Sequence, residues 1–303
     1  MTSPLVAVRG PAEAPPAPST VAWLLRDAAE RLGAAGIATP RQDAEALLAD
    51  VLGTTRLGLY TTGYASVSSA GRAAFEALVV RRARHEPVQY LLGEAEFAGL
   101  VLAIGPGVFI PRPETEALVD RALALGPPGP STVLDLCAGS GAIACALAMR
   151  RQDWSVWAVE QASSAAACAR ANVRRLGLDR RVQVIEGDLF GPLTGRVPAG
   201  EVDLVVANPP YLAASIVPTL PVEVREWEPR GALDGGPDGL SVIRRLLAEA
   251  PAWLRPGGHL LVELGEEQGP ATRELVRAAG RYAEALVHRD FRGCERVLEA
   301  RRG

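Results

Sequence analysis

The stretch VLDLCAGSGAIA, residues 133–144, joins the end of a predicted β-strand to the start of a predicted helix through a glycine-rich turn. Glycines at such a turn let the backbone approach a ligand closely, and the first turn of the helix offers free N–H groups. A dinucleotide-binding turn would read G-x-G-x-x-G, whereas Cys137, Gly139 and Gly141 lie two residues apart, with Asp135 before them. This spacing favours S-adenosylmethionine (AdoMet) over NAD.

Short β-rich runs alternate with helical segments around this turn. The predicted strands are TVLDL, SVWAVE, RVQVIEG, VDLVVAN and HLLVEL. Such alternation predicts an α/β fold, a mostly parallel sheet with helices on both faces. The last runs, EALVHRD and CERVLEARR, are expected to pair as an antiparallel hairpin. We assign this domain to residues 87–303, with residues 87–112 as the linker or hairpin that leads into it.

The N-terminal part has a different composition. Residues 1–19 are rich in proline and alanine without periodicity, so we expect a disordered tail. Apolar residues then recur at helical spacing in three sets between Val21 and Val79. The third set stops near Pro87, because a proline disfavours helix in the residue before it. Residues 20–86 are therefore predicted to form a small all-α domain.

Composition limits the function. With 303 residues, 48% of them hydrophobic, the chain can bury a large core. It has no apolar run of about 18 residues, and its first residues do not resemble a signal peptide, so we expect a cytoplasmic protein. A net charge of −3 argues against broad nucleic-acid binding. The four cysteines form no CxxC pair and the three histidines are scattered, so we expect reduced thiols and no metal.

Two acidic residues end later strands of the predicted sheet. Glu160 follows the glycines by about twenty residues, where a carboxylate can accept hydrogen bonds from ribose hydroxyls. Asp188, in EGDLF, is a candidate acceptor for an adenine amino group. An acid at a strand end is often merely solvated. We interpret both as cofactor ligands because they follow the glycine turn in order, each at the carboxyl end of a strand.

The fourth predicted strand ends in ANPPY, residues 207–211. Ligands of open α/β sheets bind where the strand order reverses, so Asn208 is expected beside the glycine turn. Each proline fixes φ at about −65° and lacks an N–H, which makes this arm stiff and rich in acceptors. We expect the Asn208 side-chain oxygen and the Pro209 carbonyl to accept the two N–H groups of a planar nitrogen, while Tyr211 packs against its flat face.

This arm predicts methyl transfer to an amide or aromatic amine. Such a nitrogen is a poor nucleophile because its lone pair is delocalised, and its proton is too weakly acidic for an ordinary general base. Two carbonyl acceptors would bend the nitrogen and expose the lone pair. Alignment contributes up to about 7–11 kcal/mol and each aimed hydrogen bond about 3 kcal/mol, so positioning outweighs acid–base catalysis. The alternative interpretation is a rigid loop after a strand.

Six segments together resemble the HemK/PrmC family of peptide chain release factor glutamine methyltransferases. The resemblance covers roughly residues 20–300. The arm alone is shared with methyltransferases of DNA and RNA amino groups, whereas IPRPETE and the helical N-terminal domain are more specific. The segments are PVQYLLGEAEF (87–97), FIPRPETEALV (109–119), LDLCAGSGAIA (134–144), ANPPY (207–211), EPRGALDGGPDGL (228–240) and ERVL (295–298).

The resemblance implies a class I AdoMet-dependent methyltransferase with a Rossmann-like seven-stranded sheet. Such an enzyme methylates the side-chain amide nitrogen (N5) of the glutamine in the Gly-Gly-Gln loop of class 1 release factors, and its helical domain helps to bind the release factor. The catalytic residues would be Asn208, Pro209 and Tyr211, and these with Pro210 would bind the substrate. The cofactor-binding residues would be Asp135, Cys137, Ala138, Gly139, Ser140, Gly141, Glu160, Asp188, Leu189 and Asn208.

Two residues depart from the family pattern. Cys137 stands where the family usually has glycine, and Glu160 where it usually has aspartate. A cysteine is tolerable at that turn if its φ is negative, and a glutamate only reaches further. We therefore expect altered AdoMet affinity rather than lost activity.

Two segments have alternative interpretations. In IPRPETE, Pro113 and the following acids suit the first turn of a helix, so Arg112, Glu114 and Glu116 are either structural or line the active site. The glycine-rich segment 228–240 either binds ligand or simply precedes a helix.

Three other functions remain open. An RNA or DNA amino-group methyltransferase would use the same arm but should carry clustered arginines, of which Arg81, Arg82 and Arg84 offer only a short run. A paralogous protein-glutamine methyltransferase is the second, and a non-enzymatic AdoMet- or partner-binding protein the third. Asn208 argues against the last, because a protein without turnover has no need of it. We expect a monomer that methylates release factors and binds neither membranes nor nucleic acid.

Overall fold

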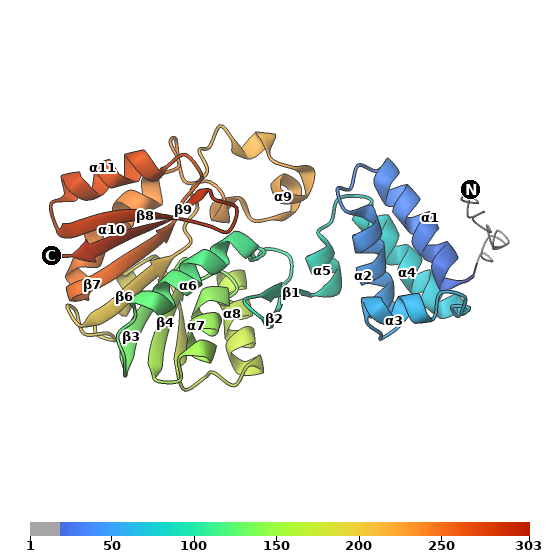
Figure 1. Ribbon diagram of the computed structural model, residues 1–303, viewed down its shortest axis with the longest axis horizontal. Coiled ribbons are helices and arrows are strands. Elements are labelled where there is room, and N and C mark those ends of the chain that lie inside the picture. Colours follow the sequence, from blue (N-terminus) through green and yellow to red (C-terminus); the bar gives the residue numbers. More distant parts are fainter. Residues whose placement is uncertain (1–18) are drawn as a thin grey trace, which may run out of the picture. The chain divides into compact units, whose positions relative to one another are not determined.

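The computed structural model describes residues 19–303, which divide by their internal contacts between Leu92 and Gly93 into two units (Figure 1). The expected tail, residues 1–19, lies outside the described residues except for its last residue. The division falls a few residues after the boundary expected at 86/87, because Val88, Leu91 and Leu92 pack against the core of the helical unit.

The first unit is a small bundle of helices around an apolar core. Side-chain caps fix three of its helices, since the hydroxyls of Thr20, Thr55 and Ser68 accept from the N–H groups of Trp23, Gly58 and Gly71. Two short helices were not predicted from the sequence. The helices are α1 (Val21–Ala34), α2 (Pro40–Val51), α3 (Arg56–Thr61), α4 (Ser69–Arg82) and α5 (Val88–Leu92).

The second unit is built on a seven-stranded sheet of order β5-β4-β3-β6-β7-β9-β8. The first five strands in this order are parallel, and β9 runs antiparallel to both neighbours. All five predicted strands and the C-terminal hairpin are confirmed. The strands are β3 (Ser131–Leu136), β4 (Trp154–Glu160), β5 (Val182–Glu186), β6 (Val202–Ala207), β7 (Leu254–Glu263), β8 (Tyr282–Arg289) and β9 (Glu295–Arg302).

Helices cover both faces of this sheet, which confirms the α/β class (Figure 1). Successive residues of a strand point to opposite faces, so Val133 belongs to the core beneath α6, α7 and α8, and Leu134 to the core beneath α10 and α11. The helices are α6 (Glu116–Leu125), α7 (Ala142–Arg150), α8 (Ser163–Arg175), α10 (Ser241–Trp253) and α11 (Gly269–Ala279).

Smaller elements lie in the connections. The hairpin β1–β2 precedes the sheet, and the long connection after β6 contains α9. None of the helices among residues 19–303 is long and apolar enough to cross a membrane. The small elements are β1 (Glu94–Phe97), β2 (Leu100–Ala103), η1 (Pro113–Thr115), η2 (Gly191–Leu193), η3 (Val217–Thr219), α9 (Val222–Trp227) and η4 (Arg230–Ala232).

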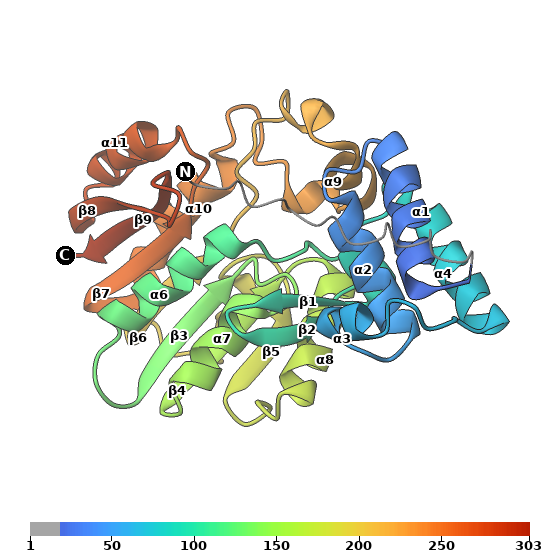
Figure 2. The ribbon, with the colours of Figure 1, turned by 45° about the vertical axis from the view of Figure 1, so that its right-hand side comes forward.

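The strand order reverses at β3, with β4 and β5 on one side and β6 and β7 on the other (Figure 2). The fourth strand of this sheet in chain order, β6, therefore lies beside the first, β3, as the sequence predicts. Leu136 and Ala207, the last residues of β3 and β6, are register partners. Cys137 and Asn208 consequently begin their loops at the same edge of the sheet.

Candidate active site

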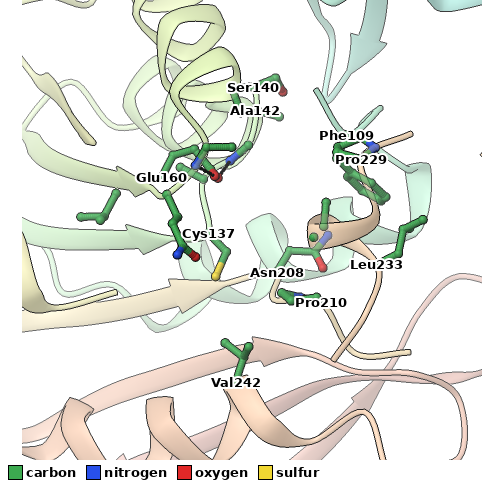
Figure 3. Close-up of a pocket in the computed structure, with 18 of the residues that line it drawn as sticks. Phe109, Cys137, Ser140, Ala142, Glu160, Asn208, Pro210, Pro229, Leu233 and Val242 are labelled. Carbon is green, nitrogen blue, oxygen red and sulfur yellow. Dashed lines mark hydrogen bonds between the residues drawn. The ribbon is translucent and has the colours of Figure 1, made fainter. Parts of the chain in front are cut away.

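A cavity of about 600 Å³ lies at this edge, in the size range typical of small-molecule sites (Figure 3). The loops after β3, β4, β5 and β6 form one part of its wall. The segment before α6, the loop that follows α9 and one face of α10 form the rest. The position, outside the carboxyl ends of parallel strands at the switch point, is the expected one for this architecture.

The glycine turn after β3 forms the floor of the cavity. Gly139 and Gly141 have φ of +55° and +77°, a region that favours glycine. A Cβ on Gly141 would come within 3.1 Å of the Ala169 Cβ, so close packing also requires this glycine, whereas the space beside Gly139 is open. Ala138, Gly139 and Ser140 line the cavity, and Gly141 is the N-cap residue of α7.

Cys137 adopts a positive φ of 59°, so the sequence-based assumption of a negative φ is wrong. The position after β3 requires a left-handed turn, which costs a residue with a Cβ about 1–2 kcal/mol. The Cys137 side chain lines the cavity. Burial raises the pKa of its thiol, and nearby carboxylates raise it further. The thiol is therefore neutral and a poor nucleophile.

Glu160, the last residue of β4, holds the glycine turn after β3 by a hydrogen bond to its carboxylate. Its Oε2 accepts from the Gly139 N–H at 2.8 Å, and its Oε1 from the Ala162 N–H at 2.8 Å. Each carboxylate oxygen keeps lone-pair capacity for a further donor. The side chain thus lines the cavity in a fixed orientation, with acceptors available to a ligand.

Asp188 lines the cavity beyond β5, but its carboxylate is already paired. Arg245, from α10, donates to both oxygens at 3.1 and 2.7 Å. Arg245 and Leu189 line the cavity beside it. Arg245 was not predicted as a cavity residue, because nothing in a helical segment about sixty residues after Asp188 indicates which acid its arginine will pair with.

Asp135 is fully buried and is not among the cavity-lining residues. Its Oδ2 accepts from the Ala144 N–H at 2.9 Å, which fixes the first turn of α7. Its Oδ1 has no hydrogen-bond partner among the described residues. Burial raises the pKa of this carboxyl from 3.8 to about 8, and the charge of Glu160 adds to that rise. Pro209 is likewise buried and does not line the cavity.

Asn208 lies in the cavity wall between Cys137 and the apolar wall of Phe109, Pro229 and Leu233 (Figure 3). Its Nδ2 donates to the Thr115 Oγ1 at 3.2 Å. The amide oxygen of Asn208 is thereby left for a ligand.

Tyr211 follows the arm and also lines the cavity. Its hydroxyl donates to the Glu263 Oε1 at 3.2 Å. Burial raises the pKa of the Tyr211 phenol, with the Glu263 charge as a second cause, so the hydroxyl keeps its proton. The ring is therefore held as one wall of the cavity.

The segments IPRPETE and 228–240 each contain some residues that line the cavity and others that make structural contacts. Arg112 lines the cavity, with its guanidinium 4.9 Å from the centre of the Phe109 ring and paired with Glu228. Glu114 pairs instead with Arg292, and Glu116 accepts from the Ala98 N–H. In the segment 228–240, four residues line the cavity: Pro229, Gly231, Ala232 and Leu233.

Phe109 and Thr115 line the cavity but were not predicted from the sequence. Both belong to the segment FIPRPETE, in which the charged residues were the ones considered. The sequence around Thr115, a hydroxyl between two acids, does not indicate a place in the cavity, because the same residues suit the start of a helix. Among residues 19–303 no cluster of three His, Cys, Asp or Glu side chains is arranged to hold a metal ion.

Two family models match the chain. The model described as PrmC N-terminal domain matches residues 24–93, and the one described as methyltransferase small domain matches residues 115–219. Among curated relatives, a release factor glutamine methyltransferase of Moorella thermoacetica is 41% identical, over 93% of this chain and 99% of its own length. One of Mycolicibacterium smegmatis is 42% identical, over 89% and 94%.

Solved structures resemble the fold. A methyltransferase from Pyrococcus furiosus has a TM-score of 0.51 and 19% identity, covering 75% of this chain and 98% of its own. The catalytic domain of hMettl16, in complex with the MAT2A 3′UTR hairpin 6, has a TM-score of 0.56 and 17% identity, covering 74% and 81%. At these identities the likeness concerns the methyltransferase fold alone.

We predict that Cys137→Gly stabilises the protein. Removing the Cβ relieves about 1–2 kcal/mol of left-handed strain, offset by about 0.5–1 kcal/mol from the greater freedom of glycine in the unfolded chain. Urea denaturation should show the net gain. Cys137→Ala, which loses the thiol but keeps the Cβ, is the matched control and should show none. A glycine variant less stable than the alanine variant would contradict the strain argument.

A second prediction concerns the pH dependence of stability. Because the folded-state pKa of Asp135 is raised from 3.8 to about 8, the folded protein keeps a proton that the unfolded chain loses. The free energy of unfolding should therefore fall as the pH rises from about 4 to about 8. Asp135→Asn removes this contribution, so its stability should change less between pH 5 and pH 8 (roughly the ends of this window) in urea denaturation. Equal slopes in both proteins would refute the assignment.

Proposed function

Because the chain belongs to the family of release factor glutamine methyltransferases, we propose that it transfers the methyl group of AdoMet to the side-chain amide nitrogen (N5) of the glutamine in the Gly-Gly-Gln loop of class 1 release factors. One observation carries the proposal. The Asn208 amide stands at the end of β6, beside the glycine turn of β3, with its Nδ2 bound to Thr115 and its oxygen left to accept. An acceptor there suits an NH₂ group.

The residues at the β3 end of the cavity fit AdoMet. Open space beside Gly139 admits a ligand close to the backbone. Glu160, held by two backbone N–H groups, keeps acceptor capacity for ribose hydroxyls. When bound, AdoMet supplies a methyl carbon on a positively charged sulfur. We propose that Cys137 to Ser140 and Glu160 hold it, with Asp188 and Leu189 at the adenine and Asp135 and Gly141 supporting the turn from below.

The arm then positions the substrate. Asn208 Oδ1 accepts an N–H group of the glutamine amide, and the ring of Tyr211 packs against its plane. Pro209, which is buried and does not line the cavity, keeps the arm stiff instead of contacting the amide. The acceptor on Asn208 favours a nitrogen that becomes tetrahedral, because a positively charged N–H donates more strongly than a neutral one. The glutamine amide keeps both protons until its nitrogen gains positive charge by accepting the methyl group from the AdoMet sulfur. One proton then leaves to water, so no general base is required.

The acceptor is a protein, and the helical unit is the proposed place for recognising it. That unit carries the match to the PrmC N-terminal domain, over residues 24–93. We propose that it contacts the release factor while the glutamine enters the cavity of the second unit. We further propose that the enzyme acts as a monomer in the cytoplasm, where translation terminates.

Methyl-labelled AdoMet tests the substrate. Four acceptors are offered in parallel, namely a class 1 release factor, its Gln→Ala loop variant, a tRNA and duplex DNA. Label on the release factor that is lost in the loop variant is expected. Label on nucleic acid would keep the role of Asn208 but overturn the release factor as substrate. Label on none would point to another protein substrate.

We predict that Asn208→Ala lowers kcat by roughly 10²-fold or more, as for other single groups aimed at a transition state. AdoMet affinity, measured by calorimetry, should change little, since Glu160 and the glycine turn remain. Normal turnover of the variant would end the proposed role of Asn208.

Glu160→Ala is the complementary variant. It should raise the AdoMet dissociation constant roughly 10-fold or more, because bonds to a charged acceptor contribute about 1.5–3 kcal/mol each. Glu186→Ala is its matched control, since Glu186 ends the neighbouring strand β5 and bonds Ser163 rather than lining the cavity. Equal affinities for the two variants would refute the ribose assignment.

A further inference from the structure

We propose that Thr115 and Glu263 are positioning residues that fix which end of the Asn208 side-chain amide faces the substrate. This inference rests on the proposed function, in which the Asn208 oxygen accepts from an NH₂ group. Neither residue belongs to the arm itself. Thr115 comes from η1, and Glu263 is the last residue of β7, the strand next to β6.

An asparagine amide has a built-in ambiguity. Its oxygen and its NH₂ group have nearly the same shape, but one accepts and the other donates. With the oxygen inward, Asn208 binds a substrate NH₂ group. With the amide turned by half a rotation, two donors would face each other and the substrate would be repelled. A neighbouring group must therefore select one orientation.

Thr115 is that neighbour, but a hydroxyl does not select by itself. Its oxygen lies 3.2 Å from Asn208 Nδ2, and the residue is only 3% exposed. A hydroxyl can either accept or donate. It could thus satisfy either end of the amide, unless its single proton is already committed elsewhere.

We infer that the Thr115 hydroxyl proton is directed to Glu263. The residue is 1% exposed; its Oε1 accepts from the Tyr211 hydroxyl, and its buried Oε2 has no hydrogen-bond partner among the described residues. The Thr115 hydroxyl is the other group that lowers the pKa of this carboxyl, as a donor would. An ionised carboxylate only accepts, so we infer that Thr115 turns its proton toward Glu263 and offers lone pairs to Asn208. The donors then run in one direction, from Asn208 to Thr115 to Glu263. The Asn208 oxygen is left facing the cavity.

The ionisation of Glu263 sets this direction. Burial raises the pKa of Glu263 from 4.5 to about 7, and Glu114 adds to the rise. Arg296, on β9, and the hydroxyls of Thr115 and Tyr211 oppose it. Protonated Glu263 could donate to Thr115, which would reverse the chain. The kcat should therefore fall as the pH drops below about 7, where Glu263 gains its proton.

The test compares isosteric variants in the release-factor methylation assay. Thr115→Val and Glu263→Gln should each lower kcat roughly 10–100-fold, the usual cost of losing a group that orients another, with little change in AdoMet dissociation constant. Thr115→Ser, which keeps the hydroxyl, should restore most of the rate. Thr272→Val is the matched control, because the equally buried hydroxyl of Thr272 bonds only carbonyls of the α11 region. It should leave kcat unchanged.

Two further readouts separate positioning from packing. Both residues act through one amide, so the double variant Thr115→Val with Glu263→Gln should lose no more rate than either single variant. The fall of kcat below neutral pH should also disappear in both single variants. Multiplicative losses in the double variant, or equal losses for valine and serine at position 115, would overturn the inference.

A measurement without substrate completes the test. The Asn208 side-chain NH₂ gives an NMR signal that is assigned by its loss in Asn208→Ala. We expect Thr115→Val and Glu263→Gln to shift it and to increase its exchange with water, and Thr115→Ser to preserve it. An unchanged signal in Thr115→Val would refute the inference even if the wild-type protein methylated no acceptor. Absence of methylation by the wild type alone would instead refute the proposed function.

Discussion

The parallel pairing of β3 with β6 is the constraint on which the site depends. Leu136 and Ala207 are register partners, and each is the last residue of its strand. The glycine turn and the proline arm therefore leave the sheet at the same level and face one cavity. A slip of one residue would turn alternate side chains to the other face and separate the two ends. Buried residues on both faces, such as Val133 and Leu134, hold the register.

The fold was predictable because its signals are local. Each strand is a short apolar run, the turn after β3 shows its glycines, and the arm shows its prolines. The places of Thr115 and Glu263, the residues proposed to orient Asn208, were not predictable. Thr115 stands between two acids, and Glu263 is the next-to-last residue of the apolar run HLLVEL, where an acid suggests a solvated strand end. Thr115 contacts Asn208, and Glu263 contacts Tyr211 of the same arm, only because β7 packs beside β6 and η1 lies at the same edge.

The backbone conformation at position 137 was also not predictable from the residue types. The spacing of Cys137, Gly139 and Gly141 indicated a ligand-binding turn, but residue types alone did not indicate that position 137 is itself left-handed. Glycine would be the unstrained choice there. The chain instead keeps a side chain with a neutral thiol against the cavity. Local strain of this kind persists where the surrounding structure fixes the backbone, here between β3 and α7.

The ion pair of Asp188 with Arg245 gives the two ends of the cavity different sensitivity to salt. Both side chains are 47% exposed, so dissolved ions screen their attraction. A higher ionic strength would release Asp188 from Arg245 and leave its oxygens free for an incoming donor. Thr115 and Glu263, at the other end, are shielded from solvent. The contacts at the Asp188 end of the cavity therefore depend on ionic strength, whereas those around Thr115 and Glu263 depend on it much less.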